Sequence, residues 1–329
     1  MRNVLIFGAA GFLGRHVRAE LTADFNVVCP SRADCDLVGV DVLTLTELVR
    51  VVRPVAVVNC AGLVAGTTAE LVTGNTVVTA KIIDSIARGA PDARFVRLGS
   101  AAEYGRVPHG HSVSETDQAN PLSEYGVSQL AATRLVDIAT AAGRLDGVVL
   151  RVFNPVGPGL PTSNVLGDAA RLLQTAISRG ASEVPLALLD TYRDFVDVRD
   201  IAAAVRATVL AGSLPERVFN IASGTTVSVR EAVRLLCRTA GYPGEVRGGE
   251  LAPSAARSAA VPWMRADVSR AARVLGWTAR HDLASSLKAL WADTATPPGP
   301  RPRLPTAPRP TGHQQRSPEG ATRNRRPLS

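Results

Sequence analysis

Three glycines near the start of the chain have a spacing that could bind phosphate groups. Gly8, Gly11 and Gly14 end a short apolar run and open a helical pattern, in the segment FGAAGFLG. Such glycines permit a tight turn and a close approach of the backbone to a pyrophosphate, and the free N–H groups of the following helix stabilise the phosphate charge. The segment therefore predicts a dinucleotide-binding loop.

The tip of the second predicted strand indicates which dinucleotide is bound. An acid here binds the ribose hydroxyls of NAD, whereas an arginine accommodates the 2′-phosphate of NADP. Ser31 and Arg32 occupy the tip, and the first carboxylate is that of Asp34. We therefore expect NADP(H) to be favoured over NAD(H), although Arg32 as an exposed loop residue is the alternative.

A tyrosine and a glutamine could share one face of a helix in the segment SEYGVSQLAATR. Tyr125 and Gln129 are four residues apart, which is about one helical turn. A phenol titrates near pH 10, so Tyr125 is protonated at pH 7 and can donate a proton, whereas Gln129 carries no charge. The spacing therefore predicts that the two side chains lie close together on one helical face.

Strand and helix patterns alternate along the first half of the chain. The strand patterns are continuous runs of Val, Leu and Ile, as expected when helices cover both faces of a parallel sheet. This alternation predicts an α/β fold with a Rossmann-type doubly wound sheet. The predicted strands are 3–7, 25–30, 55–62, 94–100 and 147–154, and the helices are 11–23, 44–52, 71–89 and 121–143. Thr44 and Glu47 have the spacing of a capping box at the start of the second helix.

Three regions follow from these patterns. Residues 1–155 are predicted to form an NAD(P)-binding domain, and residues 156–295 a smaller mixed α/β substrate lobe, some of whose segments return to the sheet. One strand of this lobe is predicted at 193–198. Residues 296–329 are predicted to be a disordered tail, because nine prolines and seven arginines from Pro297 onward show no periodicity.

Composition argues against several classes of partner. The formal net charge is +8, but about +6 of it lies in the tail, where seven arginines face one acid, Glu319. No basic helix or basic–aromatic surface is evident in the body, so we expect no nucleic-acid partner. No run reaches the roughly 18 apolar residues of a membrane span. The four cysteines lack metal-ligand spacing, which indicates a reduced, cytoplasmic protein without a metal site.

Taken in order, the motifs resemble those of the extended short-chain dehydrogenase/reductases, the NAD-dependent epimerase/dehydratase family that mostly handles nucleotide sugars. The resemblance runs from Val4 to about Trp277. It is carried by the segments GAAGFLG, NCAG, NTVVTAKIID, GSAAEYG, YGVSQ, LRVFNPVGPG and RDFVDVRDIA. It implies a small-molecule substrate linked to a nucleotide, and a homodimer that pairs through the helices containing Lys81 and Gln129.

The resemblance also implies roles for individual residues. Ser100 would hydrogen-bond the reacting oxygen, and Tyr125 would exchange a proton with it. Asn154 and Arg193 would contact the sugar or pyrophosphate of the substrate. Gln129 stands where the family carries a lysine that binds the nicotinamide ribose. The implied cofactor-binding residues are Gly8, Gly11, Phe12, Leu13, Gly14, Ser31, Arg32, Asp36, Leu37, Cys60, Ala61, Gly62, Tyr125 and Gln129.

Each of these roles has a structural alternative. Ser100 could serve only to cap a helix, and Tyr125 could be an ordinary half-buried tyrosine. Arg193 could form an internal ion pair with an acid such as Asp197, although its planar fork also suits a diphosphate.

Three small residues narrow the reaction. Ala101 and Ala102 stand where the 4,6-dehydratases of the family carry an Asp–Glu pair, and Ala102 and Gly159 replace the cysteine and histidine of the GDP-fucose synthase branch. Alanine and glycine cannot move a proton, which argues against dehydration and against epimerisation by enolisation. Ketone reduction and 4-epimerisation remain.

The glutamine separates these two reactions. A positive charge ~5 Å from a phenol at an effective dielectric constant of ~20 is worth roughly 3 kcal/mol, or about two pKa units. Gln129 can still bind the ribose hydroxyl, but it supplies no such charge and so does not lower the pKa of Tyr125 as the lysine would. Alcohol oxidation needs the tyrosinate and suffers, whereas reduction uses the neutral phenol.

The sequence therefore predicts an NADPH-dependent ketoreductase. Its substrate would be a nucleotide-linked deoxysugar of the 4-keto-6-deoxyhexose type or a related secondary metabolite, as in antibiotic biosynthesis. Two alternatives stay open: an NAD-dependent sugar-nucleotide 4-epimerase, and a non-catalytic dinucleotide-binding regulator.

Overall fold

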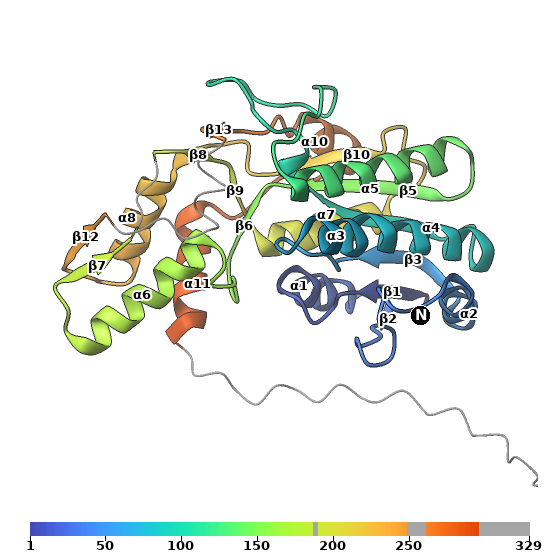
Figure 1. Cartoon of the computed structure of the whole chain (residues 1–329), viewed down its shortest axis with the longest axis horizontal. Coiled ribbons are helices and arrows are strands. Elements are labelled where there is room, and N and C mark those ends of the chain that lie inside the picture. Colours follow the sequence, from blue (N-terminus) through green and yellow to red (C-terminus); the bar gives the residue numbers. More distant parts are fainter. Residues whose placement is uncertain (187–189, 249–260, 296–329) are drawn as a thin grey trace, which may run out of the picture. The chain divides into compact units, whose positions relative to one another are not determined.

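The computed structural model describes residues 1–186, 190–248 and 261–295 (Figure 1). The predicted tail at 296–329 lies outside these ranges. No helix within them is both long enough and apolar enough to cross a membrane.

A six-stranded sheet, parallel at every strand pair, forms the centre of the fold. Its strand order is β10-β5-β4-β3-β1-β2. The strands are β1 (Asn3–Phe7), β2 (Asn26–Val28), β3 (Pro54–Asn59), β4 (Arg94–Ser100), β5 (Asp146–Val152) and β10 (Val218–Ile221). From β1 the chain first adds β2 at one edge of the sheet. It then returns to the other side of β1 and adds β3, β4, β5 and β10 in that order. This topology confirms the predicted Rossmann-type fold and places the ligand crevice at the carboxyl ends of β1 and β3.

Alternate side chains of the strands pack against two helical layers. Leu5 and Phe7 of β1 belong to one core and Val4 and Ile6 to the other. The first core includes residues of α2 (Val42–Val52), α4 (Val78–Gly89) and α5 (Glu124–Ala141). The second includes residues of α1 (Phe12–Leu21), α7 (Val198–Leu210) and α10 (Ser269–Leu275). Burial on both faces explains why the strands are apolar without alternation.

A third core belongs to a smaller group of elements beside the sheet (Figure 1). Helices α6 (Val165–Arg179), α8 (Val229–Thr239) and α11 (Leu283–Ala295) enclose fully buried leucines, among them Leu173 and Leu236. The short elements are α3 (Thr68–Leu71), η1 (Val72–Val77), η2 (Ala101–Glu103), β6 (Asn154–Val156), β7 (Glu183–Pro185), β8 (Tyr192–Arg193), β9 (Phe195–Asp197), β11 (Val227–Ser228), β12 (Glu245–Arg247) and β13 (Trp263–Met264).

Three local predictions were wrong in detail. Helix α2 begins at Val42, and its cap is Asp41, whose Oδ1 accepts from the Thr44 amide at 2.9 Å. The predicted capping box at Thr44 therefore does not form. The strand predicted at 193–198 is divided into β8 and β9, which belong to different sheets. The helix predicted at 71–89 contains a π-helical segment, η1, at residues 72–77.

Arg94 offers a test of how the sheet is joined to its helices. It lies at the start of β4, is buried, and donates to Asp146 Oδ2 at 2.8 Å and to the carbonyls of Thr208, Ala211 and Gly212 at 2.6–2.8 Å. We predict that Arg94→Met lowers the free energy of unfolding by about 2–4 kcal/mol, because buried acceptors lose their donors. Urea denaturation measures this loss.

The matched control is Arg134→Met on the exposed face of α5, where the arginine lies 3.7 Å from Asp137. Such a surface pair contributes about 0–1 kcal/mol. If the two variants lost equal free energy of unfolding, the buried hydrogen bonds of Arg94 would not stabilise the fold as we predict.

Candidate active site

The glycine loop forms a close-packed cradle between β1 and α1. Gly8 has a φ of +76°, and the Gly11 amide donates to its carbonyl at 3.0 Å. A Cβ on Gly8 would lie 2.5 Å from Ala61 N, and one on Gly14 would lie 2.0 Å from Gly8 O. Helix α1 begins at Phe12 without a side-chain cap at Gly11. Its first amides, including those of Leu13 and Gly14, can therefore donate to a phosphate, which fits a dinucleotide.

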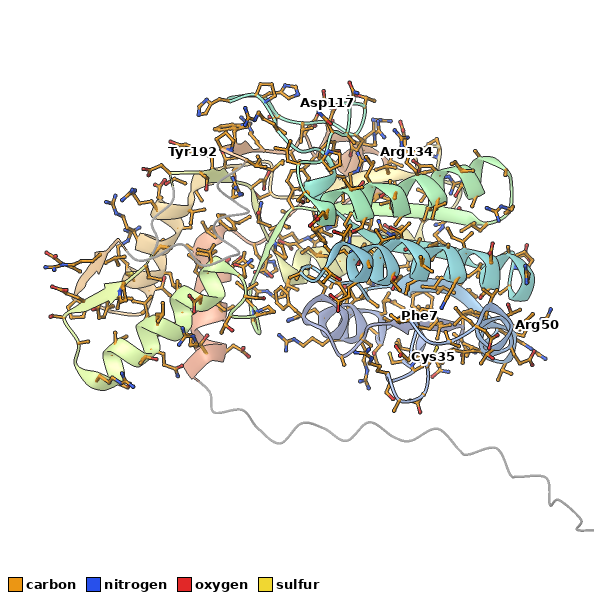
Figure 2. The ribbon with its side chains drawn as sticks, in the orientation of Figure 1. Phe7, Cys35, Arg50, Asp117, Arg134 and Tyr192 are labelled. Carbon is orange, nitrogen blue, oxygen red and sulfur yellow. The ribbon has the colours of Figure 1, made fainter. Side chains whose placement is uncertain are left out.

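The loop after β2 holds its first carboxylate against its own backbone. Asp34 Oδ2 accepts from the amide and the hydroxyl of Ser31, at 2.9 and 2.7 Å, and these bonds lower the pKa of Asp34. Arg32 has an 83% exposed side chain and lies 3.5 Å from Asp36 Oδ1. Figure 2 shows Cys35 on the same loop. The tip of β2 thus presents a hydroxyl and an exposed guanidinium, while Leu37 packs inward against the core.

The end of β3 lies directly beside the end of β1. The Cys60 amide donates to the carbonyl of Phe7 (labelled in Figure 2) at 3.0 Å, and the Ala61 amide donates to Asn59 Oδ1 at 3.0 Å. Burial raises the pKa of Cys60 to about 12, so its thiol stays protonated. Cys60, Ala61 and Gly62 therefore line the same strand ends as the glycine cradle, as a structural wall and not as a nucleophile.

Asn75 joins this wall to helix α5, a role that the sequence analysis did not identify. Its Oδ1 accepts from the Leu63 amide at 2.8 Å, and its Nδ2 donates to Leu63 O at 2.9 Å and to Ser128 Oγ at 3.0 Å. In the sequence, the available signal was an asparagine within a largely apolar helical pattern. The π-helical segment that contains Asn75 brings this side chain between the two elements.

Ser100 and Tyr125 come together at the junction of β4 and α5. Ser100 ends β4, its Oγ accepts from the Ala102 amide at 3.1 Å, and its side chain is near enough to the Tyr125 phenol to lower the pKa of that phenol. Tyr125 lies half-buried in the first turn of α5. A Cβ on Gly126 would lie 2.5 Å from Ala102 O, so a glycine is needed for this close packing. Ser100 thus caps η2 and also reaches the tyrosine.

The surroundings of Tyr125 keep its phenol protonated. Burial raises its pKa above the ordinary value and is the largest influence. The hydrogen bond from Ser100 and the charge of Arg97 lower the pKa, and the charge of Glu103 raises it. Because the net shift is upward, the phenol of Tyr125 is protonated at neutral pH.

A buried cation that the sequence analysis did not identify lies beside Gln129 and acts on Tyr125. Arg97, in the middle of β4, is 2% exposed and donates from Nη2 to Gln129 Oε1 at 2.6 Å. Gln129 is itself buried, one turn after Tyr125 on α5. The sequence signal was an arginine within an otherwise apolar strand, but its partner lies 32 residues away.

The two residues predicted to contact substrate, Asn154 and Arg193, both lie next to Asp194, Asn154 through a hydrogen bond and Arg193 as the preceding residue. Asn154 Nδ2 donates to the Asp194 carbonyl at 2.9 Å. Arg193 is buried, and burial lowers its pKa to about 10. Asp197 forms an ion pair with Arg199 at 2.7 Å. Asn154 begins β6, which pairs with β9 outside the central sheet, and Arg193 ends β8 two residues before β9 begins.

Comparisons with known proteins agree with this geometry. The model of the NAD dependent epimerase/dehydratase family matches residues 4–222. The dTDP-6-deoxy-L-talose 4-dehydrogenase (NAD(P)(+)) of Kitasatospora kifunensis is 36% identical over 90% of this chain and 96% of its own length. The GDP-6-deoxy-D-mannose reductase of Pseudomonas aeruginosa is 27% identical, with 89% and 97% covered. The structure of RMD from Pseudomonas aeruginosa complexed with NADPH superposes with a TM-score of 0.77 at 26% identity, covering 89% of this chain and 97% of that one.

The cradle predicts the effect of a single methyl group. In Gly14→Ala the new Cβ would meet Gly8 O at 2.0 Å, so α1 must move away from the turn. We expect the dissociation constant of NADPH to rise at least about tenfold, or 1.4 kcal/mol, because the helix amides leave the phosphates. Quenching of protein fluorescence by NADPH measures it.

Gly212→Ala is the control, since a Cβ there would meet nothing within 4 Å. Unchanged affinity in Gly14→Ala would show that the cradle does not hold the dinucleotide.

Proposed function

We propose, because the chain belongs to the NAD dependent epimerase/dehydratase family, that it is an NADPH-dependent ketoreductase acting on the 4-keto group of a nucleotide-linked 6-deoxyhexose. The proposal is supported by a glycine cradle that fits a dinucleotide, and by the half-buried Tyr125, whose phenol burial keeps protonated and whose pKa is influenced by Ser100. The names of the two relatives, a 4-dehydrogenase and a reductase of nucleotide-linked 6-deoxy sugars, support this class of substrate.

Proton delivery is the work of the protein's own residues. When bound, NADPH supplies a hydride to the carbonyl carbon of the substrate. Tyr125 gives its phenolic proton to the carbonyl oxygen, and Ser100 donates a hydrogen bond to the same oxygen. The product is an alcohol, and the tyrosinate recovers a proton from solvent. Positioned acids of this kind contribute roughly 10²–10⁴-fold to a rate.

We expect the cofactor to be bound by the three segments described above: the glycine loop, the loop after β2 and the end of β3. The amides of the first turn of α1 would bind the pyrophosphate, and Arg32 would bind the 2′-phosphate of NADPH. Gln129 would donate to the nicotinamide ribose. The support for NADPH over NADH is the exposed guanidinium of Arg32 together with the engagement of Asp34 by Ser31.

The substrate would enter beside β6. Arg193 would pair with the diphosphate of the nucleotide, and Asn154 would contact the sugar.

Two further expectations concern the assembly and its surroundings. Exposed apolar side chains on η1 and α5, namely Val72, Val77, Val127 and Ile138, support a homodimer that pairs through these helices. The four free cysteines support a reducing compartment such as the cytoplasm.

Tyr125→Phe tests the proton donor. We expect kcat for NADPH-dependent reduction of a 4-keto-6-deoxyhexose nucleotide to fall about 10²–10⁴-fold, with little change in NADPH affinity. Because the pKa of Tyr125 is raised, the rate of wild-type reduction should stay level through neutral pH and fall only as pH rises through that pKa. NADPH absorbance across a pH series gives both readings.

Tyr242→Phe is the control, since that phenol donates to the carbonyl of Ala181 in the smaller group of elements. Undiminished turnover in Tyr125→Phe would refute the assigned donor. Purification with NAD held tightly, and indifference to added NADPH, would favour the 4-epimerase. Dinucleotide binding without turnover of any nucleotide-linked ketone would favour a regulator.

Arg32→Ala tests the choice of dinucleotide. We expect the dissociation constant of NADPH to rise about tenfold and that of NADH to change little, because only NADPH carries the 2′-phosphate. Arg50→Ala is the control, because Arg50 is also exposed but lies on α2 and not in the loop after β2. Equal losses for both dinucleotides would count against a phosphate contact.

A further inference from the structure

Arg97 is the centre of a buried polar group beneath the strand ends of β4 and β5. Its Nη1 donates to Thr133 Oγ1 at 3.2 Å and its Nε to Thr79 Oγ1 at 3.3 Å. Its Nη1 also lies 3.9 Å from Glu103 Oε1. These contacts tie β4 to α4 and α5 at once, so the guanidinium cannot move without disturbing both helices.

The charged side chains of this group interact with one another. Glu103 accepts from Arg151 Nε at 2.9 Å, and the guanidinium of Arg151 lies 4.6 Å from the centre of the Tyr104 ring. Two guanidiniums, of Arg97 and Arg151, thus share the carboxylate of Glu103. The carboxyl of Asp137 on α5 also interacts with Arg151. A buried charge acts over longer distances than an exposed one, because solvent screens it weakly.

The contact with Gln129 fixes which end of the carboxamide faces Arg97. A guanidinium has donors but no acceptor, so only the amide oxygen can face it. The 2.6 Å bond from Arg97 Nη2 therefore requires Oε1 on this side. The Nε2 group, with two N–H donors, must then project from the other side of the carboxamide.

We propose that Arg97 is a positioning residue for proton transfer at Tyr125: it orients the Gln129 amide as a hydrogen-bond donor and supplies the positive charge of the site. The function of one ammonium group at position 129 is thereby divided between two side chains, one for the hydrogen bond and one for the charge. The proposal deepens the proposed function and rests on it for the identity of the proton donor.

Two charged groups act on Tyr125, and they act in opposite directions. Arg97 of β4 favours the ionised phenol and Glu103 of η2 disfavours it, while Ser100 favours it through a hydrogen bond. Arg151 of β5 acts on Arg97. Removal of the Arg97 charge would leave Glu103 to raise the pKa of Tyr125 further.

The test is a phenol titration of the free protein, which needs no substrate. Ultraviolet difference spectra of each variant, minus those of the same variant carrying Tyr125→Phe, isolate Tyr125 from the other three tyrosines. We expect Arg97→Met to raise the pH of half-ionisation by about one unit or more. We also expect it to weaken NADPH binding severalfold, because Gln129 loses its fixed orientation. An unchanged titration in a folded Arg97→Met protein overturns the proposal.

Arg94→Met is the matched control, because Arg94 is a second buried arginine of β4 whose partners are Asp146 and three backbone carbonyls. It should lower stability and leave the Tyr125 titration and NADPH affinity unchanged. If Arg94→Met shifted the pH of half-ionisation of Tyr125 as much as Arg97→Met does, the cause would be a general loosening of β4. That result would contradict the proposal.

A charge swap completes the test. Gln129→Lys alone places an ammonium against the Arg97 guanidinium, so its melting temperature should fall. The double variant Arg97→Met/Gln129→Lys should regain the wild-type melting temperature and the wild-type pH of half-ionisation of Tyr125. It can still be measured if Arg97→Met alone does not fold. A folded double variant whose phenol titrates a unit or more above wild type overturns the proposal. Absence of turnover with every ketone would refute the proposed function and leave these readings intact.

Discussion

A carboxylate with no exposure to solvent is the constraint on which the site depends. Glu103 is fully buried, and burying an unpaired charge costs several kcal/mol. Its oxygens are satisfied by Arg151 Nε at 2.9 Å and by the Ser100 amide at 3.1 Å. Because these donors belong to β5 and to the end of β4, the carboxylate fixes the two strand ends against each other. The position of the Ser100 hydroxyl follows from this pairing.

The same buried charges set the chemistry that the site can perform. A phenol among apolar side chains alone would be too weakly acidic to release its proton readily, whereas a phenol beside an exposed cation would feel a screened charge. Tyr125 lies between these limits, because burial raises its pKa while Ser100 and Arg97 lower it. Glu103 contributes in both directions: it raises the pKa of Tyr125 directly, and it stabilises the guanidinium of Arg97 that opposes it.

Close packing imposes the second constraint, at the dinucleotide cradle. The approach of Gly14 to Gly8 O, and of Gly126 to Ala102 O, leaves no room for a side chain. Both contacts pack a helix N-terminus against the segment that follows a strand, one in the glycine loop after β1 and one in η2 after β4. Glycine therefore does the same work at both places. It lets a helix begin close enough to the sheet for its first turn to reach the ligand.

The sequence by itself determined the features that depend on local spacing. The glycine interval fixed the strand–turn–helix of the cradle, the continuous apolar runs fixed a parallel sheet with two covered faces, and the four-residue interval placed Tyr125 and Gln129 on one helical face. Only the tertiary structure decided that Arg97 meets Gln129, that Asp41 caps α2, and that residues 193–198 divide between two sheets. The physical reason is that a turn or a helix brings together residues within a few positions of one another. The partner of a buried charge is instead set by how separate elements pack, and by which groups that packing removes from water.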